Sequence, residues 1–256
     1  MIDPFHLEAY GVTTVNYNRD VEIFPVLSAI FEEIMGECPY KSPTDMGVNM
    51  AGNCIIDDEA CKEASRQEII RRYYNCLCDL KRGNSTPAVL YKLELLMKQA
   101  GITVADRKVI AAAMNREEAP AAAIELPDGT LVTGKTSDLL GASAACLLNA
   151  LKILAGIDHE IHLVSPDAIH PIQTLKINYL GSQNPRLHTD EILIALSISA
   201  ATSPDAARAL NAVPLLKGCE VHSSVLLSSV DEGIFKKLGM HLTCEPKNEE
   251  KDVKKQ

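Results

Sequence analysis

The chain has 256 residues, of which 46% are apolar and only 4% aromatic, with no tryptophan. Its formal charge of −9 argues against general binding of nucleic acids, because phosphates are neutralised by a basic protein surface. No run of about 18 apolar residues and no signal peptide occurs, so we expect a soluble, cytoplasmic protein that does not bind membranes. The eight cysteines include no Cys-x-x-Cys pair, so we expect reduced thiols and no metal site.

The first part of the chain is predicted to be helical. A leading segment, 1–56, contains a helix over about 20–35, in which Pro25 should introduce a kink. We interpret this segment as the continuation of a missing N-terminal domain. A helical subdomain, 57–119, follows as an antiparallel cluster. Its three helices are expected at 58–81, from Thr86-Pro87 onwards and from Thr103 onwards.

Residues 120–246 are predicted to form a three-layer α/β/α domain with a mixed sheet, followed by a disordered tail, 247–256. Two strands, 121–126 and 131–135, flank an Asp-Gly turn that is typical of a hairpin. A buried, almost wholly apolar helix should then run from Thr136 or Ser137 to Gly156. Further strands are expected at 160–164, 221–228 and 240–244, and further helices from 165, at 189–201, at 203–212 and at 231–238.

A polar loop near residue 45 is a first candidate binding segment. It carries hydroxyl, carboxylate and amide groups on Ser42, Thr44, Asp45 and Asn49. Such groups can bind phosphate, a sugar or a metal, whereas Ser-Pro-Thr-Asp can equally be a capped turn. We predict that this loop contributes to a site.

A second candidate lies at the start of the predicted helix 189–201. His188 precedes the helix, Asp190 and Glu191 lie in its first turn, and Arg186 comes just before. One interpretation is an acid–base and ligand-binding cluster at a helix N-terminus, which attracts anions. The alternative is simple capping electrostatics. His222, on a predicted strand, is a further catalytic candidate if it faces the same crevice, although a lone histidine there is more often structural.

The string from Gly129 to Thr136 fits the pattern Gly-x-x-x-x-Gly-Lys-Thr, with Lys135 and Thr136 as candidate ligand-binding residues. A phosphate loop requires small, flexible residues whose N–H groups surround the phosphate. Thr130–Thr133 are β-formers that continue a hairpin strand, so a strand entering a capped helix is the favoured interpretation.

The order hairpin, helix, strand, helix also resembles the layers of cytidine deaminases. Those enzymes hold zinc at the starts of two helices. Here the corresponding positions, Thr136–Asp138 and Ser165–Ala168, carry no His or Cys. We therefore expect a deaminase-like topology without zinc chemistry.

Long stretches of the chain resemble a bacterial family known as domain of unknown function 1846. The similarity is carried by Ser42–Ile56, Ala121–Gly156, Asn184–Ala201 and Gly218–Ser229. The resemblance implies that fuller members are about twice as long, with an N-terminal half similar to an α/β nucleotide-handling domain. It also implies that this chain corresponds to the C-terminal half, with a phosphate-loop-like turn supplied by the other half.

Two hypotheses of different classes follow. The first is the C-terminal part of a cytoplasmic enzyme that acts on a nucleotide-like or phosphorylated small molecule, with a separately encoded N-terminal half as partner. In it, the loop around Asp45 meets the cluster around His188 between the two subdomains. The second is a non-catalytic assembly or regulatory domain that forms homo-oligomers through apolar helices. Neither hypothesis specifies a cofactor.

Overall fold

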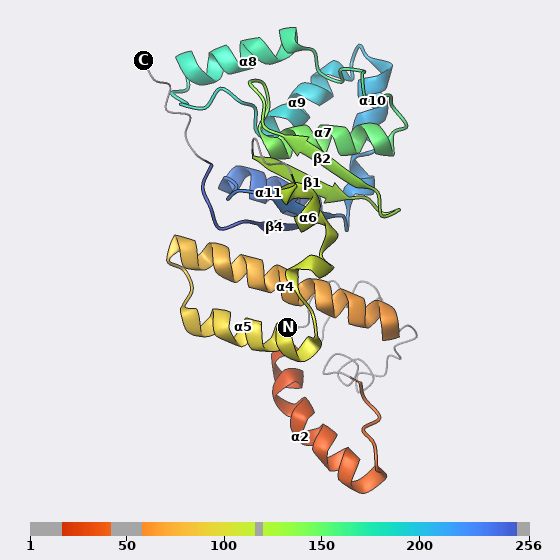
Figure 1. The fold of residues 1–256 in the computed structure, drawn as a ribbon. Coiled ribbons are helices and arrows are strands. Elements are labelled where there is room, and N and C mark those ends of the chain that lie inside the picture. The colour runs from red at the N-terminus through yellow and green to blue at the C-terminus, as the bar shows by residue number, and fades with distance from the viewer. Residues whose placement is uncertain (1–16, 42–57, 116–119, 250–256) are drawn as a thin grey trace. The chain divides into compact units, whose positions relative to one another are not determined.

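The computed structural model describes residues 17–41, 58–115 and 120–249 (Figure 1). Contacts divide the chain into two compact units, 1–69 and 70–256. Helix α4 (Asp58–Arg82) begins in the first unit and ends in the second. The predicted limits of the leading segment, the helical subdomain and the tail stay predictions.

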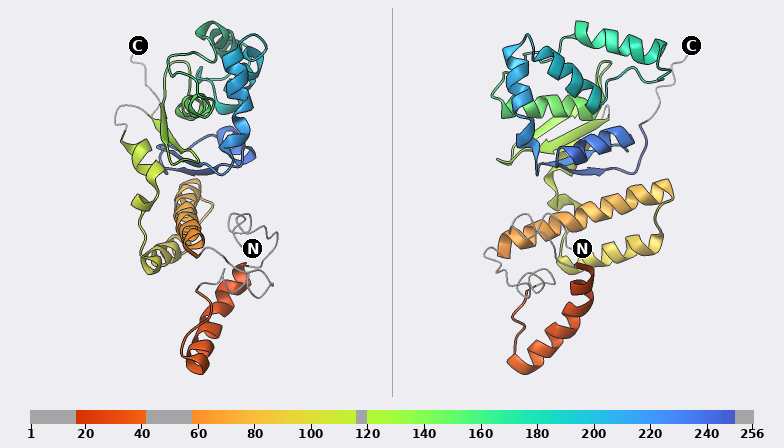
Figure 2. Two further views of the ribbon diagram at one scale, coloured as in Figure 1. Left: turned by 90° about the vertical axis from the view of Figure 1, so that its right-hand side faces the viewer. Right: turned by 180° about the vertical axis from the view of Figure 1, so that it is seen from behind.

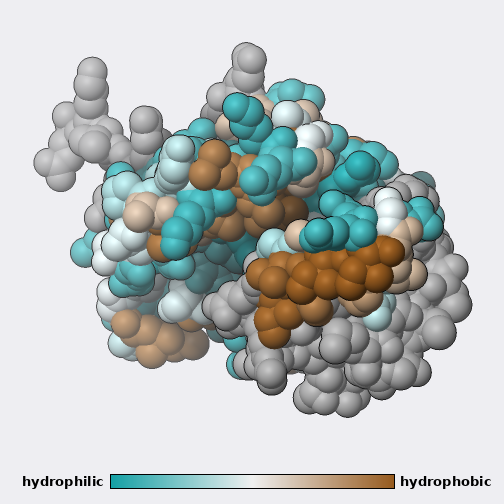
Figure 3. Space-filling view, turned by 90° about the horizontal axis from the view of Figure 1, so that it is seen from below, coloured by the Kyte–Doolittle hydropathy of each residue, from teal (hydrophilic) through white to brown (hydrophobic). Residues whose placement is uncertain are grey.

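The described part of the first unit contains helix α2 (Tyr17–Met35) and the start of α4. Helix α2 runs through Pro25 and is followed directly by Gly36, whose φ of +81° favours glycine. Figure 3 shows separate patches of apolar side chains on the face that it draws. The exposed large apolar residues of α2 are Val26, Ile30, Ile34 and Met35.

The second unit is built around a four-stranded mixed sheet in the order β2-β1-β3-β4. Strands β1 (Ala121–Glu125) and β2 (Leu131–Lys135) form the predicted hairpin. Strand β3 (Glu220–Ser223) lies antiparallel to β1 and parallel to β4 (His241–Cys244). The structure is therefore a mixed α/β fold, and the deaminase-like topology stays a prediction.

The helices of the second unit follow the predicted order, with start signals that function as expected. Ser165 and Ser203 each accept a hydrogen bond from the backbone N–H three residues later. Helices and 3₁₀ turns lie at α5 (Pro87–Ala100), η1 (Val104–Asp106), α6 (Lys108–Met114), α7 (Ala142–Leu154), α8 (Pro166–Asn178), α9 (Thr189–Ser199), α10 (Pro204–Asn211), η2 (Val213–Leu216) and α11 (Ser229–Lys237).

Helices cover both faces of the sheet (Figures 1 and 2). Alternate residues of a strand point to opposite faces. Ala122 and Ile124 of β1 belong to the main core together with residues of α7, α9, α10 and α11. Ala123 instead packs against Val109 and Ala113 of α6. The small alanines of β1 therefore allow a helix to approach each face closely.

Helix α7 lies unusually close to β2. A Cβ atom on Gly134 would lie 2.1 Å from the backbone nitrogen of Cys146, so only glycine fits there. Gly129 has a φ of +82° in the hairpin turn, and Leu131–Lys135 form the strand. The Gly-x-x-x-x-Gly-Lys-Thr string thus contains a turn and a strand, as favoured from the sequence, but the strand does not lead directly into a capped helix, because α7 begins only at Ala142.

A buried ion network holds the other face of the sheet. The Arg107 side chain is 1% exposed and pairs with Glu220, which also pairs with Arg71 at 2.7 Å. Arg107 Nη2 donates to the carbonyl oxygens of Val221 and His241 at 3.0 and 2.8 Å. Every donor bond of this kind offsets part of the cost of burying a charge, so this arginine is structural.

One predicted strand is wrong, and another was predicted too long. Residues 160–164 are not a strand: Ile161 N–H donates to the carbonyl of Asp158 in a turn, and Leu163 and Val164 pack into the core without strand pairing. The strand predicted at 221–228 ends at Ser223, and the chain then forms a loop. No helix in the described segments is both long and apolar enough to cross a membrane.

Candidate functional site

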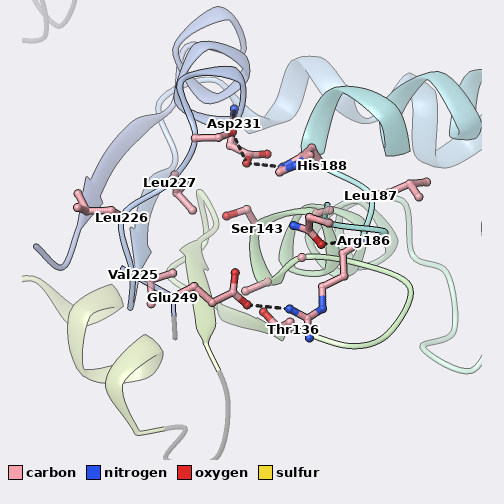
Figure 4. Close-up of a pocket in the computed structure, with 15 residues that line it drawn as sticks. Thr136, Ser143, Arg186, Leu187, His188, Val225, Leu226, Leu227, Asp231 and Glu249 are labelled. Carbon is pink, nitrogen blue, oxygen red and sulfur yellow. Dashed lines mark hydrogen bonds and ion pairs between the residues drawn. The ribbon is translucent and has the colours of Figure 1, made fainter. Parts of the chain in front are cut away.

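A cavity of about 190 Å³ lies where the N-terminal ends of α7, α9 and α11 converge (Figure 4). One wall is apolar and comes from Leu187 and the loop Val225–Leu227. The polar side chains that line it are Thr136, Ser143, Asn184, Arg186, His188, Ser228, Asp231 and Glu249. All of these residues belong to the second unit, so the cavity is contained within it.

The N-terminus of α7 opens into this cavity without a cap. The predicted start at Thr136 or Ser137 is wrong, because the Ser137 hydroxyl accepts hydrogen bonds from Leu139 and Leu140 N–H in a separate turn. The helix begins after Gly141, which has no side chain to serve as a cap. The backbone N–H groups of residues 142–144 have no acceptor in the described part of the chain. They therefore present partial positive charge to the cavity.

Ser143 adds a second unusual feature to this end of α7. Its side chain lies among the lining residues in Figure 4 and is 4% exposed. Its Oγ atom has no hydrogen-bond partner among the described residues. A buried hydroxyl without a partner costs free energy. The hydroxyl and the α7 N–H groups together can bind an anionic group.

His188 caps α9 and is oriented by Asp231 of α11. Its Nδ1 lies 2.9 Å from Asp231 Oδ2, and the other carboxylate oxygen accepts bonds from Thr189 N–H and hydroxyl at 2.9 and 2.8 Å. The Ser228 hydroxyl adds a fourth bond to this carboxylate at 2.8 Å. Asp231 therefore fixes both the ring of His188 and the first turn of α9.

The electrostatics of this pair determine the protonation of the ring. Burial alone would raise the pKa of Asp231, but hydrogen bonds from His188, Thr189 and Ser228 outweigh it and lower that pKa to about 2. The bond to Asp231 in turn raises the pKa of His188 despite burial. Because the carboxylate is ionised, Nδ1 must carry a proton, and Nε2 is the atom left for a ligand.

Arg186 brings a cation to the cavity. Its Nη1 pairs with Glu249 at 3.0 Å, and its Nε donates to the carbonyl of Ser137 at 2.9 Å. The side chain of Asn184 accepts from the Arg186 backbone N–H at 3.1 Å. The guanidinium is therefore held in place next to the α7 end.

This arrangement suits anion binding and acid–base chemistry. Within the described segments the Ser143 hydroxyl has no base within hydrogen-bonding distance, so these residues do not form a serine–histidine relay. Among the described residues, no three His, Cys, Asp or Glu side chains are placed to hold a metal ion.

The structure brings together some of the predicted site residues. Thr136, Arg186 and His188 all line the cavity. Glu191 lies behind it, where its carboxylate accepts from His188 N–H at 2.8 Å and from Lys176 at 2.7 Å. It therefore caps α9, and the capping interpretation describes its observed contacts.

Three other candidates lie elsewhere. Asp190 and the exposed Lys135 do not line the cavity. His222 is fully buried on β3, 2.9 Å from the Thr243 hydroxyl and in edge-to-face contact with the ring of Tyr74. The His222 ring packs against Tyr74 of α4, on the face of the sheet opposite α7, so it does not face the cavity next to His188. Burial lowers its pKa.

The candidates Ser42, Thr44, Asp45 and Asn49 lie outside the described residues. Their predicted meeting with the cluster around His188 stays a prediction.

Five polar residues of the cavity were not identified from the sequence: Ser143, Asn184, Ser228, Asp231 and Glu249. Ser143 follows Gly141-Ala142, and a run of small residues at a helix start is a weak signal of ligand approach. Asp231 follows Ser228 at the spacing of a capping sequence, and the Ser228 hydroxyl does accept from Asp231 N–H at 3.2 Å. Its pairing with His188, 43 residues away, has no local sequence signal.

Comparisons with known proteins agree with the resemblance found in the sequence. The model described as "Domain of unknown function DUF1846, C-terminal" matches residues 105–253, and its N-terminal counterpart matches residues 1–101. The expectation that the chain is only a C-terminal half is therefore corrected, because both models match it.

Similar proteins occur in several bacteria. UPF0371 protein cu0538 of Corynebacterium urealyticum is 58% identical over 250 residues, which are 96% of this chain and 50% of that protein. A UPF0371 protein of Corynebacterium glutamicum is 58% identical over 254 residues, 98% of this chain and 51% of the relative. UPF0371 protein str1377 of Streptococcus thermophilus is 56% identical over 249 residues, with coverage of 96% and 50%. The chain spans about half the length of these relatives and belongs to the DUF1846 family.

Proposed function

We propose that this chain is part of a cytoplasmic enzyme that binds a phosphorylated or nucleotide-like small molecule in the cavity at the α7 N-terminus. The phosphate accepts hydrogen bonds from the N–H groups of residues 142–144 and from the Ser143 hydroxyl. Arg186 supplies the opposite charge. A helix N-terminus combined with an arginine is a common way to bind phosphate.

His188 is the acid–base group in this proposal. Asp231 holds its ring by Nδ1, so Nε2 is the atom that exchanges a proton with the ligand. An Asp-oriented imidazole with a raised pKa keeps its proton to a higher pH than a free histidine does, and it can donate that proton to a leaving oxygen. The apolar wall of Leu187 and Val225–Leu227 contacts the uncharged part of the molecule.

The observation that carries the proposal is the unpartnered Ser143 hydroxyl at the uncapped end of α7. If this hydroxyl is purely structural, Ser143→Ala removes a buried unsatisfied group and leaves binding and stability unchanged or slightly improved. If it binds the phosphate, the same variant loses a hydrogen bond to a charged group, worth about 1.5–3 kcal/mol, or at least tenfold in affinity.

The test is calorimetric titration of wild type and Ser143→Ala with inorganic phosphate and with a nucleoside monophosphate. Ser197→Ala is the matched control, because this exposed hydroxyl of α9 bonds only to its own helix at Ile194. Equal affinities for wild type and Ser143→Ala, or no binding by the wild type, would refute the proposal.

A second candidate is assembly through apolar helix surfaces. Ile194 and Ile198 lie one turn apart on α9 and are 61% and 68% exposed. Such exposed apolar groups can form contacts with a second copy or with a separately encoded family partner. Light scattering on the wild type and Ile198→Glu tests this: a monomeric wild type contradicts self-association, and dissociation by Ile198→Glu supports it.

A further inference from the structure

The carboxylate of Glu249 occupies part of the candidate site. It lies among the lining residues in Figure 4 and pairs with Arg186 Nη1 at 3.0 Å. The preceding segment is attached to the cavity wall: Glu245 N–H donates to Ser223 O at 2.9 Å, and Leu226 N–H donates to Lys247 O at 2.8 Å. Glu249 therefore follows directly on a segment that backbone hydrogen bonds hold in place.

We propose that Glu249 is a specificity-determining residue that competes with the ligand for Arg186 and restricts the cavity to phosphate monoesters over simple carboxylates. This inference rests on the proposed function of the same cavity. In the structure without ligand, Glu249 occupies the position on Arg186 that an anionic ligand group would take.

The charges explain the selection. A ligand carboxylate that displaces Glu249 replaces one carboxylate–guanidinium pair with another, so Arg186 contributes no net gain. A phosphate dianion carries twice the charge and three terminal oxygens. It can reach Arg186, the Ser143 hydroxyl and the α7 N–H groups at the same time.

The guanidinium of Arg186 is held in one position, where it can pair with Glu249 or with a ligand. Its Nε donates to the carbonyl of Ser137 at 2.9 Å, which fixes the guanidinium plane beside the cavity. The ion pair is partly open to solvent, with side-chain exposures of 25% for Arg186 and 37% for Glu249. Glu249 can therefore be displaced into water by a stronger competitor at a modest cost.

The test compares wild type and Glu249→Gln by calorimetric titration with methyl phosphate and with acetate. The substitution keeps the size of the side chain and removes its charge. We expect methyl phosphate to bind about two- to fivefold more tightly to the variant, as for a partly exposed ion pair. Acetate should gain by a larger factor than methyl phosphate, because its single charge then meets a guanidinium that no other carboxylate neutralises, so the preference for phosphate falls.

Glu160→Gln is the matched control, since it changes the net charge equally at an exposed position that does not line the cavity. Thermal melting checks that both variants are folded. An equal gain in Glu160→Gln would show a general charge effect and overturn the inference.

The remaining outcomes separate the two proposals. If the wild type binds methyl phosphate and Glu249→Gln binds both ligands with unchanged affinity, the role of Glu249 is refuted while the proposed function stands. If neither protein binds methyl phosphate, the proposed function fails, and the inference fails with it.

Discussion

Replacing Gly141 with aspartate should fill the open α7 end with a carboxylate of the protein itself. Gly141 has φ −67° and ψ 157°, a backbone conformation that aspartate adopts without strain. A Cβ atom there meets only the carbonyl oxygen of Leu187, at 3.7 Å, which is ordinary contact. The new side chain can therefore accept hydrogen bonds from the first-turn N–H groups, as a normal N-cap does.

The effect on stability should be small and positive. Aspartate exceeds glycine as an N-cap by a few tenths of a kcal/mol, and a negative charge at a helix start adds about 0.3–1 kcal/mol. The sum of about 0.5–1.4 kcal/mol corresponds to a rise in Tm of about 1–6 °C for a chain of this size. Differential scanning calorimetry measures it, with Gly141→Ala as the control that adds a Cβ without a cap.

The effect on phosphate binding should have the opposite sign. The ligand loses its N–H donors and faces a carboxylate, whose repulsion at about 4 Å is worth about 1–4 kcal/mol between water-like and surface dielectric conditions. Affinity should therefore fall at least about fivefold in Gly141→Asp and much less in Gly141→Ala. Phosphate binding that is unchanged in Gly141→Asp would refute the assignment of the α7 N-terminus as the anion site.

Two further substitutions test the pair that orients the imidazole and the close helix approach. The stability difference between wild type and His188→Asn should be largest below pH 6.5 and shrink as the pH rises through the raised pKa of His188. The ionised Asp231 contributes to stability above about pH 4, and this contribution is lost as the pH falls towards 2. Urea unfolding of both proteins across this pH range measures the difference. His222 has a lowered pKa and acts with the opposite sign, but it is present in both proteins, so its contribution cancels. A difference in stability that does not change with pH would contradict the ion pair. Gly134→Ala should destabilise the protein by about 1–3 kcal/mol or more, because its Cβ collides with the backbone of α7. Gly233→Ala on α11, where a Cβ meets nothing within 4 Å, should instead be neutral or stabilising, so equal behaviour of the two alanines in thermal melts would be inconsistent with the close approach.

Local signals located most helices and the hairpin correctly. Ser165 and Ser203 precede proline and cap the helices that follow, because a side-chain oxygen can reach the N–H three residues later whatever the rest of the fold. The Asp-Gly turn of the hairpin has the same local origin, with Gly129 at positive φ. Apolar content was a weaker guide: in 160–164 only Leu163 and Val164 pack into the core, and they do so as irregular chain without strand pairing.

The candidate site was only partly predictable. Arg186 and His188 were identified from their position at a helix start and Thr136 from the Gly-x-x-x-x-Gly-Lys-Thr string, and all three line the cavity. His222 was grouped with them because it lies on a strand of the same sheet. Its side chain points to the opposite face, and the face of a short strand depends on which helices cover it.

The sequence by itself determined most of the helices and the hairpin, because caps, turns and apolar periodicity act over a few residues. It also determined membership of the DUF1846 family. Only the tertiary structure decided that the starts of α7, α9 and α11 converge, that Asp231 holds His188, and that Glu249 reaches Arg186. These contacts join residues 43 and 63 positions apart, and such distances are closed by the packing of helices on the sheet rather than by any local preference of the chain.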